Sequence, residues 1–480
     1  MMDAAVNTEP LFLAVQWLFV GYVVAMNSGY LALYLLSVVC LRRSLEGRAL
    51  DVLPKVATAY QPPVTIIVGA HNEQASISPW VRALLHLDYP EFEIIVVNDG
   101  SRDATLSTLR REFRLALFPE AAWKRLSTRT VHGIYRSALF PNLRVIDKAH
   151  GGKADALNAG VNAARYPLLC SVNARSILQR HSLSRIVQPF LEDPVTIAAG
   201  ASPRIANGSA ISDALLTKVG LPRQMLGLMQ IVEYLRTELF SRIAWSALNA
   251  ALVIPGGITV FRKEAIVSVG GYRTDVMDPD IEVILRLHRL YRLSRKPYRI
   301  ALVPDPVCWI EAPETLAQLR RRRMRWQRGL SDALMVNRGL VHPRGGAAGW
   351  LAFPYVALFE WLGPLLEVTS YAAVTAVWLC GGISTLAFLS LLLMAAGFGV
   401  LVSVSALTLE EASFRVYAQP RRLGTLLTSA VAENLGYRQL QAWWGLRGLW
   451  QWLHGARDHP DGRKDAQQKP PRPKRRQSSG

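Results

Sequence analysis

The amino-acid sequence predicts an α/β domain with a mostly parallel sheet, flanked on both sides by transmembrane helices. Short β-branched runs alternate with helical segments through the middle of the 480-residue chain, as in parallel strands joined by helices. Long uncharged stretches lie near both ends and have the length needed to cross a bilayer. Half of the residues are hydrophobic and 19% are charged, a composition that excludes a disordered chain.

The first apolar stretch runs from Leu11 to Leu41 without a charged residue. It predicts one tilted transmembrane helix, so residues 1–45 are expected to form an N-terminal membrane anchor. Asn27 and Ser28 in its middle also allow a tight hairpin. A cleaved signal peptide is not expected, because the stretch is too long and acidic residues precede it. Basic residues follow at once: Arg42, Arg43 and Arg48. The positive-inside rule therefore places the N-terminus outside and the next domain in the cytoplasm.

Four runs in the middle of the chain have the composition of strands buried on both faces. They are Val64–Val68, Phe92–Val97, Asn142–Asp147 and Leu168–Val172. Helical segments separate them, the clearest running from Gly152 to Arg165. We therefore expect parallel strands with right-handed crossovers.

Polar residues follow each of these four strands. The clusters are His71-Asn72-Glu73, Asn98-Asp99-Gly100-Ser101, Lys148 to Lys153 and Asn173-Ala174-Arg175. A single cluster would be ordinary turn chemistry, since Asp, Asn, Gly and Ser favour turns for local reasons. Four consecutive clusters indicate a binding site instead, because the carboxyl ends of parallel strands meet at one edge of the sheet.

A second membrane region is expected at residues 349–408. Its first part contains Glu360 and Glu367, and because carboxylates are costly in lipid this part should lie at the interface or face a protein interior. The rest is uncharged, and Gly381-Gly382 should divide it into two spans. Two further segments complete the chain: an amphipathic cytoplasmic or interfacial segment over residues 409–456 and a basic disordered tail over residues 457–480. The tail is expected either to be solvated or to contact anionic lipid headgroups.

The chain carries a formal net charge of +19. Such a surplus indicates a polyanion, a phosphorylated ligand or an anionic membrane face as partner. A nucleic-acid partner is not expected, because much of the surplus lies beside apolar segments and no nucleic-acid-binding motif is present. The four cysteines are far apart in the sequence and predict no disulfide framework, which fits a chain that faces a reducing cytoplasm.

Six motifs occur in order over about residues 60–335. They are VGAHNE, VVNDGS, KAHGGKADALNAG, GGYRTDVMDPDIEVILRLHR, VPDPVCWIEAPE and RRRRMRWQRG. Together they resemble the inverting glycosyltransferases of family 2, in particular the membrane-embedded synthases of the poly-N-acetylglucosamine, hyaluronan and cellulose type. The resemblance implies a GT-A fold, with a Rossmann-like sheet, for residues 60–335.

The resemblance also implies roles for residues at the strand ends. In the family, the loop after the first strand and the Asp of the second hold the uracil and ribose. The matching positions are Ala70, His71, Glu73 and Asp99. A carboxylate suits this task because it accepts hydrogen bonds from N–H and O–H donors. Lys153 would approach the phosphates.

Two later motifs carry the reaction in the family. The catalytic base corresponds to Asp280, within Asp278-Pro279-Asp280-Ile281-Glu282, although acidic residues here also favour the start of a helix. The family's Gln-x-x-Arg-Trp corresponds to residues 322–326. Arg325 would face the diphosphate, Trp326 would stack at the acceptor, and Arg322 stands in the Gln position. The same basic run could instead form an interfacial helix on anionic lipid.

The end of the fourth strand departs from the family. An Asp-x-Asp motif normally bears the divalent cation there, whereas this chain has Asn173-Ala174-Arg175. A divalent ion about 5 Å from the guanidinium would meet roughly 6–7 kcal/mol of repulsion at an effective dielectric near 20. We therefore expect no ordinary metal site and assign no metal ligands. Either Arg175, beside Asn173, replaces the cation as counter-ion of the diphosphate, or donor chemistry has been lost.

Two functions remain open from the sequence. The first is a membrane-bound inverting glycosyltransferase that transfers a sugar from a nucleotide donor, expected to be a UDP-sugar, to a growing surface polysaccharide or other glycan. The alternative is a catalytically impaired relative that acts as a membrane scaffold or partner subunit of a polysaccharide export system. Both are expected in a bacterial-type inner membrane, multi-pass, with the catalytic domain in the cytoplasm. The expected partners are the nucleotide-sugar, the glycan acceptor, membrane lipids and other subunits of a synthesis or export complex.

Overall fold

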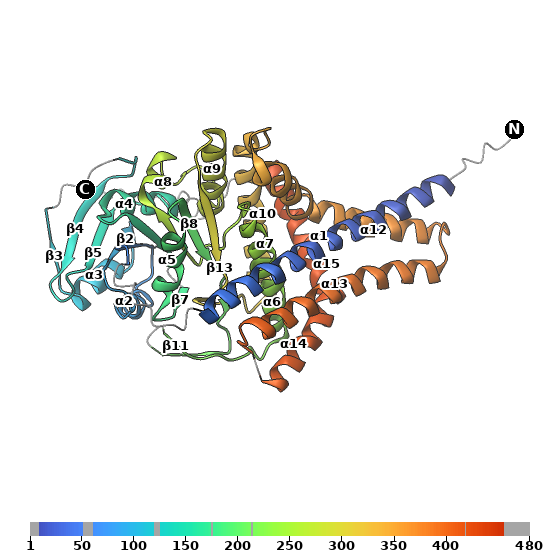
Figure 1. Ribbon diagram of the computed structural model, residues 1–480, viewed down its shortest axis with the longest axis horizontal. Helices are drawn as coiled ribbons and strands as arrows, with labels where there is room; N and C mark the ends of the chain where they lie inside the picture. The colour runs from blue at the N-terminus through green and yellow to red at the C-terminus, as the bar shows by residue number, and fades with distance from the viewer. Residues whose placement is uncertain are drawn as a thin grey trace, which may run out of the picture.

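The structure, a computed structural model, describes residues 9–50, 61–119, 125–173, 176–212, 215–417 and 419–455. Figure 1 shows a strand-rich domain at one end of the molecule and a group of long helices projecting from the other.

A nine-stranded mixed sheet forms the centre of the domain, in the order β13-β8-β12-β6-β1-β2-β5-β4-β3. Its parallel part consists of β6 (Leu168–Val172), β1 (Val64–Ala70), β2 (Phe92–Asp99) and β5 (Leu143–Lys148). These are the strands predicted from the four β-branched runs. The predicted α/β fold with a mostly parallel sheet is therefore confirmed.

Further strands, some of them antiparallel to their neighbours, extend this sheet on both sides, and the sequence patterns did not predict them. β12 (Ile258–Arg262) runs antiparallel between β6 and β8 (Thr196–Ala201), and β13 (Arg299–Val303) lies beyond β8. β4 (Val131–Ser137) and β3 (Leu115–Leu117) form the other edge. Because β12 runs opposite to β6, its first residues lie at the edge where the parallel strands end.

The remaining elements of the domain cover or flank this sheet. The smaller strands are β7 (Ser176–Leu178), β9 (Arg204–Ile205), β10 (Ala210–Ser212), β11 (Leu215–Lys218) and β14 (Cys308–Ile310). The helices are α2 (Ile77–Leu85), α3 (Thr105–Glu112), α4 (Lys153–Ala163), α5 (Ser182–Glu192), α8 (Lys263–Ser268) and α9 (Pro279–Leu293).

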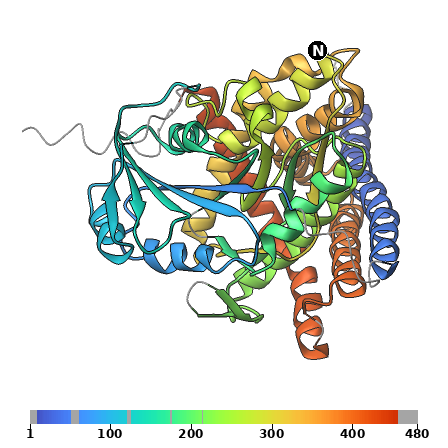
Figure 2. The same cartoon turned by 60° about the vertical axis from the view of Figure 1, so that its left-hand side comes forward.

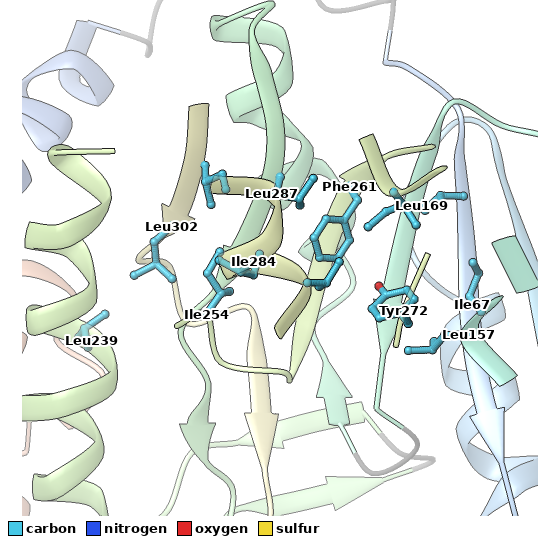
Figure 3. Close-up of a cluster of buried hydrophobic side chains, with 14 of the residues drawn as sticks. Ile67, Leu157, Leu169, Leu239, Ile254, Phe261, Tyr272, Ile284, Leu287 and Leu302 are labelled. Carbon is cyan, nitrogen blue, oxygen red and sulfur yellow. The ribbon is translucent and has the colours of Figure 1, made fainter. Parts of the chain in front are cut away.

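Apolar side chains bury both faces of the sheet. In β1, Ile67 points into one cluster with Leu157 of α4, while Ile66 and Val68 point into the cluster on the opposite face. Figure 3 shows the first cluster, with Ile67, Leu157 and Phe261 among its members. Burial on both faces explains why the parallel strands are continuous apolar runs rather than alternating ones.

A helical layer joins this domain to the long projecting helices. It contains α6 (Met225–Tyr234), η1 (Leu235–Phe240), α7 (Ser241–Ala247), α10 (Leu316–Val336), η2 (Arg338–Leu340), η3 (Ala348–Ala352), α11 (Phe353–Tyr355), η4 (Val356–Trp361), α14 (Pro420–Ala432), η5 (Glu433–Tyr437) and α15 (Arg438–Leu453). α10 packs along α9 and α15, so this layer reaches from the sheet domain to the C-terminal part of the chain.

Within the part of the chain that the structure describes, two helices are long and apolar enough to cross a membrane. They are residues Phe12–Arg42 of α1 (Glu9–Leu50) and α13 (Thr385–Ser413). Residues Ala348–Trp361 and α12 (Gly363–Leu379) form a pair bent by 49°, which would be a third span if the two parts cross together. α1 lies alongside α12 and α13 in Figures 1 and 2. α12 and α13 are separated around Gly381-Gly382, where Gly381 has φ 73°.

Two alternatives left open by the sequence are decided by local contacts. α1 is one continuous helix rather than a hairpin, because the Asn27 side chain donates back to the Val23 carbonyl oxygen at 2.7 Å. Glu360 of η4 faces a protein interior, where the Arg242 guanidinium donates to both of its carboxylate oxygens, at 3.1 and 3.0 Å.

The contact between α4 and β1 can be tested at Gly160. A Cβ added there would clash with the Ile67 side chain, which is enclosed in the core. Gly160→Ala is therefore expected to destabilise the fold by about 1–3 kcal/mol, the usual cost of overpacking. Thermal unfolding of the detergent-solubilised protein measures this as a lowered midpoint. Gly424→Ala is the matched control, because nothing lies within 4 Å of its added Cβ, and it should leave the midpoint unchanged or raised. An unchanged midpoint for Gly160→Ala would contradict the close contact.

Candidate active site

The carboxyl ends of β6, β1, β2 and β5 lie side by side, and the polar clusters predicted from the sequence meet there. The loops after β1 and β2 are tied together directly. The Asn72 amide N–H donates to Ser101 Oγ at 3.0 Å, and the Arg102 amide donates to Asn72 Oδ1 at 2.9 Å. Asn72 adopts a positive φ of 54°, which Asn tolerates better than most residues.

Asp99, at the end of β2, anchors the loop that follows β5. Its side chain is only 4% exposed, and both carboxylate oxygens accept hydrogen bonds from the protein. Oδ1 accepts from Lys148 Nζ at 2.5 Å and from the Gly151 amide at 3.0 Å, and Oδ2 accepts from the Gly152 amide at 2.7 Å. Lys148 is itself fully buried and also pairs with Asp155 at 2.6 Å. Asp99 therefore shapes the loop through internal contacts.

Two imidazole rings stack above this anchor. The ring centroids of His71 and His150 are 4.5 Å apart. Their Nδ1 atoms lie 2.8 and 3.0 Å from the Asp99 carbonyl oxygen, which accepts from both. A Cβ on Gly100 would come within 2.6 Å of the His150 backbone nitrogen, so the close approach of these two backbone segments requires glycine. The rings form a flat aromatic surface at the strand ends.

The same three residues have the composition of a metal centre. One potential ligand atom from each of His71, Asp99 and His150 lies within 4.8 Å of the others. The Lys148 ammonium, however, already contacts the Asp99 carboxylate at 2.5 Å, and a cation here would have to displace it. The arrangement fits a structural anchor better than a metal site.

Ala70 and Glu73, the other two residues expected to hold the nucleotide, do not belong to this cluster. Ala70 is buried in the core beneath the loop. Glu73 lies just before α2: its carbonyl oxygen accepts from the amides of Ser76 and Ile77, and its carboxylate accepts from Ser76 Oγ at 2.6 Å.

Lys153, Asn173 and Asp280 come together although they are far apart in the sequence. Lys153 Nζ lies 2.5 Å from Asp280 Oδ2 and 2.9 Å from Asn173 Oδ1. The charges of Asp280 and Asp278 raise the pKa of Lys153, outweighing the opposite effect of burial. Ala174 and Arg175, the other residues of this strand end, lie outside the described residues.

The start of α9 presents Asp280 to this cluster. Asp278 is the N-cap, accepting from the amides of Asp280 and Ile281 at 3.2 and 3.4 Å, and Pro279 occupies the first turn. Burial and the neighbouring Asp280 charge raise the pKa of Asp278. Glu282 is fully buried and pairs with Arg286 at 2.8 Å. Asp278 and Glu282 thus stabilise α9, whereas Asp280 contacts Lys153.

α10 places its basic residues beside this segment. Arg322, Arg325, Trp326 and Gly329 share one face of the helix by their spacing. A Cβ on Gly329 would lie 2.6 Å from Asp278 Cβ, so this face packs at the start of α9. Arg325 is exposed and Trp326 is half-buried. Arg325 and Trp326, which match the Arg-Trp of the family motif, thus lie on the face of α10 that packs at the start of α9.

Sequence reasoning missed two groups of site residues. The Gly256-Gly257 turn before β12 lies against Asp280, where a Cβ on Gly256 would come 2.6 Å from Asp280 Oδ2. The paired glycines before a β-branched strand were a usable signal. Tyr234 of α6 accepts a hydrogen bond from Arg322, whose guanidinium lies 5.7 Å from the ring centroid. No local pattern links Tyr234 to Arg322.

Comparison with known proteins gives the family. Residues 65–212 match Glycosyl transferase family 2, and residues 222–402 match Glycosyl transferase family group 2. A poly-β-1,6-N-acetyl-D-glucosamine synthase of Staphylococcus epidermidis is 26% identical over 315 residues, 65% of this chain and 66% of that protein. The protein of the same name from Staphylococcus aureus (strain COL) is 29% identical over 273 residues, 57% of this chain and 55% of that protein. The match thus spans between half and two thirds of these relatives.

A solved structure agrees with the fold. The mannosyltransferase PcManGT from Pyrobaculum calidifontis, in complex with GDP-Man and Mn2+, aligns with a TM-score of 0.53 and 20% identity, over 88% of this chain and 99% of that chain. At this identity the likeness shows the GT-A fold and nothing further. The two sequence matches cover, in order, the residues that build the sheet and the site, and they identify the chain as a member of glycosyltransferase family 2.

Proposed function

We propose that the protein is a membrane-bound inverting glycosyltransferase that transfers a sugar from a nucleotide-sugar to a growing glycan. The observation that carries the proposal is the position of Asp280. Its carboxylate stands at the edge where the parallel strands end, beside Lys153 and the Gly256 turn. A general base has to stand where donor and acceptor meet, and ligands of such sheets bind at this edge.

The donor is expected to occupy the loops after β1, β2 and β5. The stacked rings of His71 and His150 offer an aromatic surface for a nucleobase, with Ala70 and Glu73 in the same loop. The Asp99 carboxylate bonds to the loop after β5, so its contribution is to hold these groups in place. The exposed residues of these loops would then meet the ribose. A UDP-sugar is the donor proposed.

The reaction is a single displacement. The acceptor hydroxyl oxygen attacks the anomeric carbon, and the new C–O bond forms as the bond from that carbon to the diphosphate breaks. The nucleoside diphosphate leaves with the electron pair, and the hydroxyl proton passes to the Asp280 carboxylate. Attack from the face opposite the leaving group inverts the anomeric centre. Positive charges on Lys153, Arg322 and Arg325 stabilise the departing diphosphate.

The acceptor is proposed to lie along α10, where the half-buried Trp326 offers a surface on which a sugar can stack. The related poly-β-1,6-N-acetyl-D-glucosamine synthases support a polymer of N-acetylglucosamine as product. The adjoining apolar helices, which are long enough to cross a membrane, support a site near a membrane, which would suit a growing surface polysaccharide. Lipids and other subunits of a synthesis or export complex remain the proposed partners.

The role of Asp280 is tested by Asp280→Asn. The amide keeps the shape but cannot take the proton, so turnover of a UDP-sugar should fall by about 10²–10⁴-fold, while UDP affinity changes only a few-fold. Initial-rate assays and calorimetry on the purified protein measure the two quantities. Asp88→Asn, at an exposed carboxylate that pairs with His181, is the matched control and should keep wild-type turnover. Full activity of Asp280→Asn would remove it as the base. Absence of turnover in the wild type with every nucleotide-sugar tried would favour the scaffold alternative.

Membrane orientation is tested by a native thiol. Cys380 is exposed in the turn between α12 and α13, and a Cβ on neighbouring Gly382 would meet the Phe12 ring at the start of α1. The turn and the start of α1 therefore lie on the same side, which the positive-inside rule makes external. A membrane-impermeant maleimide should label the wild type in spheroplasts, and Cys380→Ser should lose the label. Labelling that appears only after permeabilisation would reverse the proposed orientation.

A further inference from the structure

The end of β6 holds an ammonium group between two oxygens. Lys153 Nζ contacts Asp280 Oδ2 at 2.5 Å and Asn173 Oδ1 at 2.9 Å. The Lys153 side chain remains 41% exposed, whereas the Asp280 side chain is 18% exposed. The positive charge is thus held from one side by the protein and open to a ligand on the other.

Hydrogen bonding fixes the orientation of the Asn173 side-chain amide. Its Nδ2 donates to the Gly256 carbonyl oxygen, which turns Oδ1 toward Lys153. The backbone supports this position, because the Ser176 amide donates to the Asn173 carbonyl oxygen at 2.9 Å and Ser176 Oγ donates to the Gly257 carbonyl oxygen at 2.9 Å. Asn173 therefore offers one neutral oxygen, and that oxygen already has a donor.

These residues do not fit a divalent cation, which family 2 enzymes usually bind at this strand end. Divalent cations of this kind favour clusters of anionic oxygen ligands. Here one carboxylate and one amide oxygen converge, and an ammonium stands between them. A second cation at this place would meet the ammonium's charge and would have to break both contacts.

We infer that the Lys153 ammonium is the resident cation of this site and binds the donor diphosphate without a divalent metal. A lysine binds phosphate well as a point charge. Lys153 also stands in the first turn of α4, where the N-terminal end of the helix dipole favours an anion, and the space around Gly152 is open. The nature of the ligand rests on the proposed function, whereas the choice of cation is a property of the chain alone.

The cation can be tested without nucleotide. Full-length protein in detergent is titrated with Mn2+, and free Mn2+ is followed by electron paramagnetic resonance. Asn173→Asp combined with Lys153→Met replaces the ammonium with a second carboxylate and should gain one Mn2+ per chain, bound at least tenfold more tightly than by the wild type. Tight Mn2+ binding by the wild type that is lost in Asp280→Asn would overturn the inference, as would a double variant that gains no site.

The diphosphate contact is tested by UDP calorimetry on the same protein. Wild-type affinity in EDTA and in MgCl2 should agree within twofold, and Lys153→Met should weaken it at least tenfold. Lys296→Met is the matched control, because this lysine is exposed in the loop after α9, and its affinity should equal that of the wild type. Loss of UDP binding in EDTA, or wild-type affinity in Lys153→Met, would overturn the inference. If the wild type binds neither UDP nor GDP, the proposed function fails, while the Mn2+ titration still decides the resident cation.

Discussion

The buried carboxylate of Asp99 is the interaction on which the site depends. A charge at this depth is stable only with an opposite charge and hydrogen-bond donors around it, and Lys148 with the amides of Gly151 and Gly152 supplies both. These contacts fix the path of the chain from β5 into α4. Lys153 is the first residue of α4, so its position beside Asn173 and Asp280 follows from the Asp99 contacts.

A buried carboxylate with charged and hydrogen-bonding partners also holds the helical side of the molecule together. Glu233 of α6 is buried and pairs with Arg323 of α10, and it also accepts from Tyr437 at 2.8 Å and Gln441 at 2.9 Å. The pKa of Glu233 is lowered because the Arg323 charge and these hydrogen bonds outweigh burial. Three segments far apart in the sequence are thereby held together. The basic residues of α10 therefore have different roles: Arg323 is structural, while Arg325, on the opposite face of the helix, remains exposed.

A second polar contact links α15 to the segment that carries Asp280. Asp332 of α10 accepts from Trp452 Nε1 at 2.8 Å and from the Met277 amide at 3.1 Å. Met277 directly precedes the Asp278 cap of α9. The position of Asp280 thus depends on α15, which follows the apolar helices in the chain. In this way α15, α10 and the proposed base belong to one packed unit.

Local pattern determined the parallel strands, the polar clusters that follow them and the long apolar helices, because each of these features is contiguous in the sequence. The ordered motifs also determined the family. Only the tertiary structure decided which polar residues meet: Asp99 with Lys148, Arg322 with Tyr234, and Lys153 with both Asn173 and Asp280. It also placed β12 antiparallel beside β6, which brings the Gly256 turn against Asp280. These pairs lie between 20 and 127 residues apart. A side chain's partner across that separation is set by how the elements pack, not by the residues next to it in the chain.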